Sequence, residues 1–114
     1  MDIELKTWMF DILQSIEEIE SYFEKEKSLE QYQKDQKTKR AVERNLEIIG
    51  EAVNRILKKE PDFKLTNSRK IIGTRNIIIH NYDFISDDLI WSIITQYLPD
   101  LKKEVKLYLN ESKK

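Results

Sequence analysis

The residues best suited to chemistry lie in one short stretch, RNIIIHNY, from Arg75 to Tyr82. It contains His80, the only histidine of the chain, five residues after an arginine and two before a tyrosine. A histidine titrates near neutral pH and can carry a proton, and an arginine can hold a phosphate through two parallel hydrogen bonds. The stretch therefore combines the residue types needed for proton transfer beside a phosphate.

One chemistry that fits these residue types is the cleavage of RNA without a metal ion. It requires a base for the proton of the ribose 2′-hydroxyl, an acid for the leaving 5′-oxygen and a cation beside the phosphate. One chain supplies a single histidine for two proton transfers. A symmetric dimer would bring two histidines and two arginines to one shared cleft, so this chemistry favours a homodimer.

The positions of these residues on a helix set a geometric condition. At about 100° per residue, Arg75 falls in the same apolar stripe as Ile78 and, if the helix continues, Tyr82. A charged guanidinium there is costly unless it is paired or opens onto a cleft. Asn76 and His80 lie on a neighbouring face, up to about 140° away. The two faces converge only if the helix ends near His80 or a second copy completes the site.

Each residue also has a purely structural interpretation when taken alone. His80 can be a polar helix cap, Arg75 an interhelical ion-pair partner and Tyr82 an aromatic side chain at the edge of the core. A solely structural bundle does not explain an arginine within an apolar stripe. The combination of the three residues therefore favours a functional site.

Hydrophobic periodicity predicts the elements that carry these residues. Apolar side chains recur every three or four residues in four segments, which is the spacing of an α-helix: Leu5 to Phe23, Val42 to Ile56, Ile71 to Ile79 and Ile90 to Tyr108. We expect an all-α fold, an antiparallel bundle of four main helices plus a short helix. The length of 114 residues is predicted to form a single domain, 1–114.

Polar and proline residues mark the expected helix boundaries. Ser28, with Gln31 three residues later, predicts the start of the short helix, and Ser86 predicts the start of the last one. Asn67 and Ser68 are candidate caps for the helix that carries Arg75. Pro61 should limit the central helix, whereas the stripe of the last helix keeps its phase across Pro99, which favours a kink.

Composition excludes several classes of protein. The chain has no cysteine, which excludes disulfides and thiolate metal sites, and no stretch near the roughly 20 apolar residues that span a bilayer. Its amino terminus lacks the pattern of a secretory signal, so we expect a soluble cytoplasmic protein. Glu43, Glu47 and Glu51 share one side of the central helix, and without nearby histidines we interpret them as a solvated acidic face. No metal or other cofactor is predicted.

Charge is unevenly distributed along the chain despite a net charge of −1. Residues 1–33 hold 3 basic and 9 acidic side chains, whereas residues 34–75 hold 12 basic and 6 acidic ones. The near-neutral total argues against a general nucleic-acid coat protein. A local basic surface and an ordinary solvated charged face both remain open interpretations of the basic segment.

The stretch from Arg75 to Tyr82 resembles the R-x-x-x-x-H-x-Y signature of the HEPN superfamily, in particular the HepT-like toxins of HEPN/MNT toxin–antitoxin pairs. The segment ERNLEIIGEAVNRI, from Glu43 to Ile56, is similar to the central helix of that family. The all-α layout and the length extend the resemblance over essentially the whole chain.

The resemblance implies a function and a role for each site residue. Arg75 and His80 would be the catalytic pair of a metal-independent endoribonuclease that acts on cellular RNA as a homodimer, with Asn76 as a supporting polar residue. Tyr82 would accept AMP from a partner MNT-type nucleotidyltransferase, the antitoxin. Some relatives with this fold are non-catalytic, so the alternative is a helical binding subunit that docks with a separate nucleotidyltransferase.

Overall fold

The computed structural model describes residues 2–25, 27–80 and 85–111, and helices account for most of them. In chain order, the helices are α1 (Ile3–Ser21), α2 (Leu29–Lys34), α3 (Gln36–Lys59), α4 (Ser68–His80), α5 (Asp87–Ser92), the π-helical turn η2 (Ile93–Tyr97) and α6 (Leu98–Glu111). Because α5, η2 and α6 follow one another directly, they form one long helical segment. The predicted all-α fold of four main helices and a short one is confirmed.

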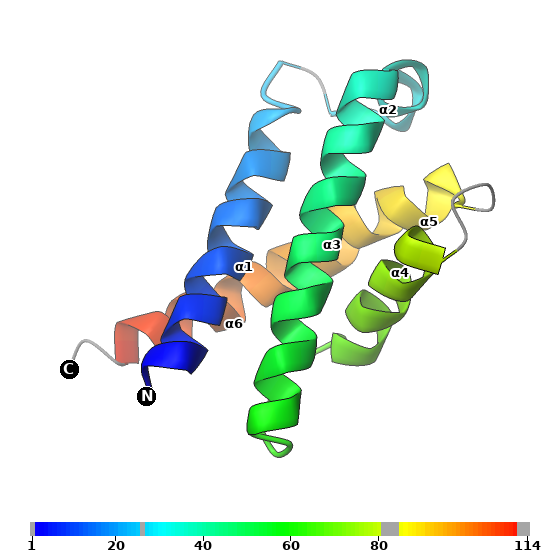
Figure 1. Ribbon diagram of the computed structural model, residues 1–114. Coiled ribbons are helices and arrows are strands. Elements are labelled where there is room, and N and C mark those ends of the chain that lie inside the picture. Colours follow the sequence, from blue (N-terminus) through cyan, green and yellow to red (C-terminus); the bar gives the residue numbers. More distant parts are fainter. Residues whose placement is uncertain (1, 26, 81–84, 112–114) are drawn as a thin grey trace.

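The central helix α3 organises the bundle. Helix α1 packs antiparallel along one side of α3, and α4 packs along another (Figure 1). The segment from α5 to α6 crosses behind them in this view, and α6 packs against α1. This arrangement leaves part of the α3 surface between α1 and α4, which is where Arg75 lies.

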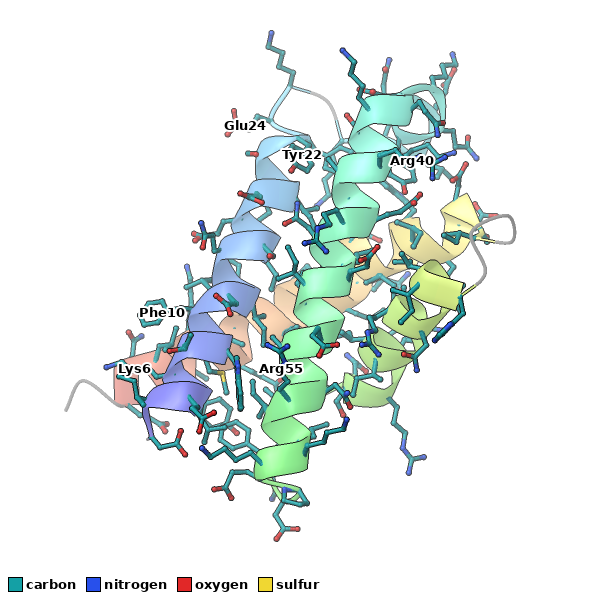
Figure 2. All side chains as sticks on the ribbon, in the orientation of Figure 1. Lys6, Phe10, Tyr22, Glu24, Arg40 and Arg55 are labelled. Atoms are coloured by element: carbon teal, nitrogen blue, oxygen red, sulfur yellow. The ribbon has the colours of Figure 1, made fainter. Side chains whose placement is uncertain are left out.

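The apolar stripes predicted from the sequence form the core. Each stripe contributes buried side chains, and the most buried of them come from all four main helical segments: Met9, Ile12, Val42, Ile49, Val53, Ile56, Ile78, Ile90, Leu101 and Val105. Phe10 instead is half exposed and lies on the side of α1 away from α3 (Figure 2). The periodicity of the sequence thus identified the faces that pack together.

Capping side chains fix where the helices begin. Ser28 accepts a hydrogen bond from the Gln31 amide at 3.1 Å, and Ser86 accepts one from the Leu89 amide at 3.3 Å, as predicted. Asp35 caps α3 through the amide of Thr38 at 3.1 Å. A hydrogen bond from the Thr38 hydroxyl, together with the one from the Thr38 amide, lowers the pKa of Asp35. These caps satisfy amide groups that a helix cannot pair internally.

Pro99 lies inside a continuous helical segment, in agreement with the prediction that it does not end the helix. The preceding residues, Ile93–Tyr97, form a π-helical turn, and α6 then begins at Leu98. A proline has no amide hydrogen and crowds the preceding turn, which a wider turn can accommodate. The core face therefore continues from Ile94 to Leu101, both of which are buried.

The loop between α3 and α4 is tied to α6. The Thr66 amide and hydroxyl both donate to the Glu104 carboxylate, at 2.9 and 2.6 Å, and the Tyr108 hydroxyl donates to the Lys64 carbonyl at 2.9 Å. Asn67, just before α4, has a φ of 64°, a conformation that asparagine tolerates better than most residues. These contacts fix the position where α4 starts.

Among the described residues, none of the helices has both the length and the apolar character required to cross a membrane.

Candidate functional site

A groove lies over α3, between α1 on one side and α4 on the other. It has a volume of about 310 Å³. Ten residues line it: Trp8 and Asp11 from α1, Arg44, Glu47, Ile48, Glu51, Ala52 and Arg55 from α3, and Arg75 and Ile79 from α4. The groove therefore brings three guanidinium groups and three carboxylates from separate helices to one surface.

Arg75 projects from the middle of α4 into this groove. Its side chain is 22% exposed, and its guanidinium forms an ion pair with the Glu51 carboxylate through Nη2. Nη1 donates to the side-chain oxygen of Asn76 at 2.8 Å. Both conditions inferred for an arginine in an apolar stripe are met, because Arg75 is paired and it borders a cleft. Two of its hydrogen-bond donors are oriented by the protein, and a guanidinium carries further donors that can bind an anion.

Glu51 holds two guanidinium groups at once. Besides Arg75, it pairs with Arg55, whose Nε lies 3.2 Å from the carboxylate. Arg55 follows one turn later on α3, in the lower half of that helix in Figure 2. The interaction of one carboxylate with two cations restricts the side chains of all three residues, although their partial exposure to solvent screens the attraction.

The interpretation of Glu43, Glu47 and Glu51 as a solvated acidic face is wrong. Glu43 is buried and lies 3.3 Å from Arg40, and Glu47 lies 3.4 Å from Arg44. Together with the pairs of Glu51, these contacts place a cation beside each carboxylate. Four of the twelve basic side chains of residues 34–75 are therefore paired with these acids: Arg40, Arg44, Arg55 and Arg75.

His80 is the last residue of α4 and is exposed. His80 is not among the residues that line the groove, whereas Arg75 and Ile79 are. The described part of one chain brings Arg75 and Asn76 together and leaves His80 at the edge of that site. Tyr82 lies outside the described residues.

Both tryptophans and Tyr97 are partly buried. The ring centroid of Trp91 lies 5.4 Å from that of Phe23 and 5.8 Å from that of Tyr32. Tyr97 packs partly buried against the core, and Trp8 is partly buried where it lines the groove. No group of three or more histidine, aspartate or glutamate side chains in the described ranges is arranged to hold a metal ion.

The sequence analysis did not identify Glu51 as a functional residue. It lies 24 residues before Arg75 and meets it only through the packing of α4 on α3. The available signal was indirect, because a buried arginine requires a carboxylate partner and Glu51 lies beside Gly50, an unusual residue for the middle of a helix.

Comparisons with known proteins identify the family of this chain. The family model described as "Ribonuclease HepT-like" matches residues 12–107. The chain belongs to the HepT-like ribonuclease family. The all-α fold and the resemblance inferred from the sequence agree with this membership.

Individual relatives carry names that agree with a ribonuclease family. The "Putative RNase MJ1380" of Methanocaldococcus jannaschii is 34% identical over 106 residues, which cover 91% of this chain and 95% of the relative. The "Probable ribonuclease HepT" of Thermococcus cleftensis is 36% identical, over 85% of this chain and 88% of the relative. The "Putative RNase TTE0752" of Caldanaerobacter subterraneus is 38% identical, over 75% and 78%. No solved structure matches the chain significantly.

Proposed function

We propose that this chain is a metal-independent endoribonuclease and the toxin of a HEPN/MNT toxin–antitoxin pair. The observation that supports this most directly is the position of Arg75 at a groove, held by Glu51 and Asn76, with His80 exposed at the end of the same helix. Family membership and the names of the relatives add support for a ribonuclease.

In the proposed reaction, the ribose 2′-hydroxyl attacks the adjacent phosphorus and the bond from phosphorus to the 5′-oxygen breaks. A base takes the hydroxyl proton and an acid protonates the leaving oxygen. The products are a 2′,3′-cyclic phosphate and a 5′-hydroxyl, so no water is consumed. His80 serves as a proton carrier, and Arg75 stabilises the negative charge on the phosphate.

The active form is proposed to be a homodimer. One chain has one histidine, and its described part leaves His80 outside the groove that Arg75 lines. A two-fold axis close to the end of α4 would place the His80 of each chain near the other copy and provide both the acid and the base.

The antitoxin is proposed to be a nucleotidyltransferase that attaches AMP to Tyr82. The phenolic oxygen would attack the α-phosphorus of ATP, pyrophosphate would leave, and the phenolic proton would pass to a base. Tyr82 is two residues from His80 in the sequence. The added phosphate would compete with substrate phosphate for the arginines.

The decisive experiment is an RNA cleavage assay in excess EDTA that compares the wild-type chain with His80→Ala. We expect only the wild type to cleave, with cyclic-phosphate and 5′-hydroxyl ends, and a loss of at least about 10²-fold for the variant. Because His80 is exposed, its replacement should not disturb the fold, so a loss of cleavage would not result from misfolding. Circular dichroism of the variant checks that it is folded.

Undiminished cleavage by His80→Ala would contradict the assignment of His80. No cleavage by the dimeric wild type of transfer or messenger RNA would favour the alternative, a binding subunit that docks with a separate nucleotidyltransferase. Expression of the chain alone distinguishes the two, since only a ribonuclease toxin should arrest growth.

Modification is tested separately with Tyr82→Phe. The variant should retain cleavage and lose labelling by the partner nucleotidyltransferase with radioactive ATP, because it lacks the accepting oxygen. Equal labelling of the variant and the wild type would exclude Tyr82 as the acceptor.

A further inference from the structure

Gly50 lies at the closest approach between α3 and α4. A Cβ atom built on Gly50 would lie 2.8 Å from the Cγ of Arg75 and closer still to its Cβ, and it would lie 3.4 Å from the Ile71 carbonyl oxygen. Non-bonded carbon atoms in proteins essentially never lie as close as the two Arg75 contacts would require. The Cβ of Arg75 is fixed to the backbone of α4. Any side chain at position 50 therefore requires α4 to move at Arg75.

The cost of glycine makes this contact informative. A glycine inside a helix is about 1 kcal/mol less favourable than alanine. Gly50 is buried in the middle of the 24-residue helix α3, where no turn requires a glycine. Its role is thus to admit the side chain of Arg75 onto the surface of α3.

The next residue acts on the other end of the same side chain. Glu51 pairs with the Arg75 guanidinium and is itself paired with Arg55 at 3.2 Å. Gly50 determines where the stem of Arg75 lies, and Glu51 determines where its charged end points. Asn76 adds a third constraint from α4 at 2.8 Å.

We propose that Gly50 and Glu51 are positioning residues for Arg75, which place its guanidinium for the bound phosphate of RNA. The inference rests on the proposed ribonuclease function. A displacement of about 1 Å in a catalytic group can lower a rate by about 10²-fold, so exact placement of the guanidinium matters. Because substrate still binds through other contacts, the effect falls on kcat more than on KM.

The chain provides a matched control for each residue. Gly73 is the other glycine, and a Cβ there meets no described atom within 4 Å. Glu43 lies two turns before Glu51 on the same helix, is not among the residues that line the groove and pairs with Arg40 rather than Arg75. Gly50→Ala is therefore compared with Gly73→Ala, and Glu51→Gln with Glu43→Gln.

Cleavage kinetics provide the first measurement. We expect kcat to fall about 10²-fold in Gly50→Ala and about 10-fold in Glu51→Gln, with KM changed less than threefold. Both control variants should remain within about twofold of the wild type. Thermal unfolding verifies that each variant is folded at the assay temperature.

Nuclear magnetic resonance of the arginine side chains provides the second measurement, which does not depend on activity. The Arg75 guanidinium should give a distinct, slowly rotating signal in the wild type and in both controls. That signal should shift in Gly50→Ala and lose its restricted rotation in Glu51→Gln, because these variants move or release the group.

The outcomes separate the two proposals. If the wild type cleaves and both test variants cleave equally well, the positioning role is wrong and the ribonuclease function stands. Faster cleavage by Glu51→Gln would also overturn it, because Glu51 would then compete with substrate phosphate. If the wild type does not cleave, the proposed function fails together with the catalytic role, and the magnetic resonance data still decide whether these residues hold Arg75.

Discussion

Two regions of the molecule differ in how they treat a polar side chain that packs against the helices. In the groove over α3, between α1 and α4, the partly buried Arg75 contacts Glu51 and Asn76. At the other end of α3, the Tyr32 side chain is almost fully buried against Phe23, and its hydroxyl has no hydrogen-bond partner among the described residues. A polar group held by specific partners is suited to chemistry, whereas the aromatic cluster serves packing.

This contrast predicts that substitutions in one region change the cleavage rate and that substitutions in the other change the free energy of unfolding. Changes in the groove should lower the cleavage rate and leave stability nearly unchanged. Changes in the aromatic cluster should alter the free energy of unfolding and leave the rate of the folded protein unchanged.

The largest effect is expected for Arg75→Ala. Loss of the guanidinium removes the cation that stabilises the phosphate, and kcat should fall by about 10²- to 10³-fold. The free energy of unfolding should change little, since the ion pair with Glu51 is partly exposed. Cleavage assays and urea unfolding of the same sample measure both quantities. A rate within threefold of the wild type would contradict the predicted difference between the two regions.

Trp91→Ala should have the next largest effect, on stability. Its ring packs edge to face against Phe23, with the ring centroids 5.4 Å apart. It lies tilted against Tyr32, with the ring centroids 5.8 Å apart. Truncation should lower the free energy of unfolding by about 3 kcal/mol, at the lower end for such substitutions because Trp91 is only partly buried. Urea denaturation measures the loss. A reduced kcat in the fully folded variant would show that this cluster also serves the site.

Tyr32→Phe tests the unpaired hydroxyl. Removal of a buried polar group without a partner should raise the free energy of unfolding by about 1 kcal/mol at neutral pH. Burial, aided by the negative charges of Glu43 and Asp87, raises the pKa of Tyr32 above its ordinary value of 10.0. The unfolded chain therefore loses this proton first, and wild-type stability should fall as the pH rises above about 10. Denaturation at several pH values should show a shallower fall in the variant.

Gly73→Ala should have the smallest effect. A methyl group there meets no atom of the described residues within 4 Å, so the variant should gain about 0.5 kcal/mol of stability from reduced freedom of the unfolded chain. Calorimetry detects such a gain. A clear destabilisation would indicate that position 73 is packed in the assembled protein, for example against a second copy.

Much of the fold followed from local patterns in the sequence. The stripes containing Ile12, Ile49 and Leu101 have helical spacing, and these residues are fully buried. Ser28 and Ser86 could be assigned as caps because capping depends on residues three positions apart. The π-helical turn before Pro99 was not predicted, since the apolar stripe is continuous on both sides of it.

The candidate site was predictable only in part. The position of Arg75 in an apolar stripe indicated that it needed a partner or a cleft, and the structure supplies both. The identity of the partner depended on how α4 packs on α3, and helical periodicity describes the faces of one helix at a time. Glu51 was therefore interpreted as solvated, although it contacts two arginines.

The packing of α4 has a consequence for local motion. Helix α4 packs chiefly on α3, whereas α3 itself is flanked by α1, α2 and α4 (Figure 1). A helix supported mainly from one side has the lowest cost of opening independently, and its amide hydrogens exchange with solvent before those of a central helix. We therefore expect α4, which carries Arg75 and His80, to open at a lower free energy than the whole bundle, and binding of RNA or a partner protein across α4 should slow that exchange.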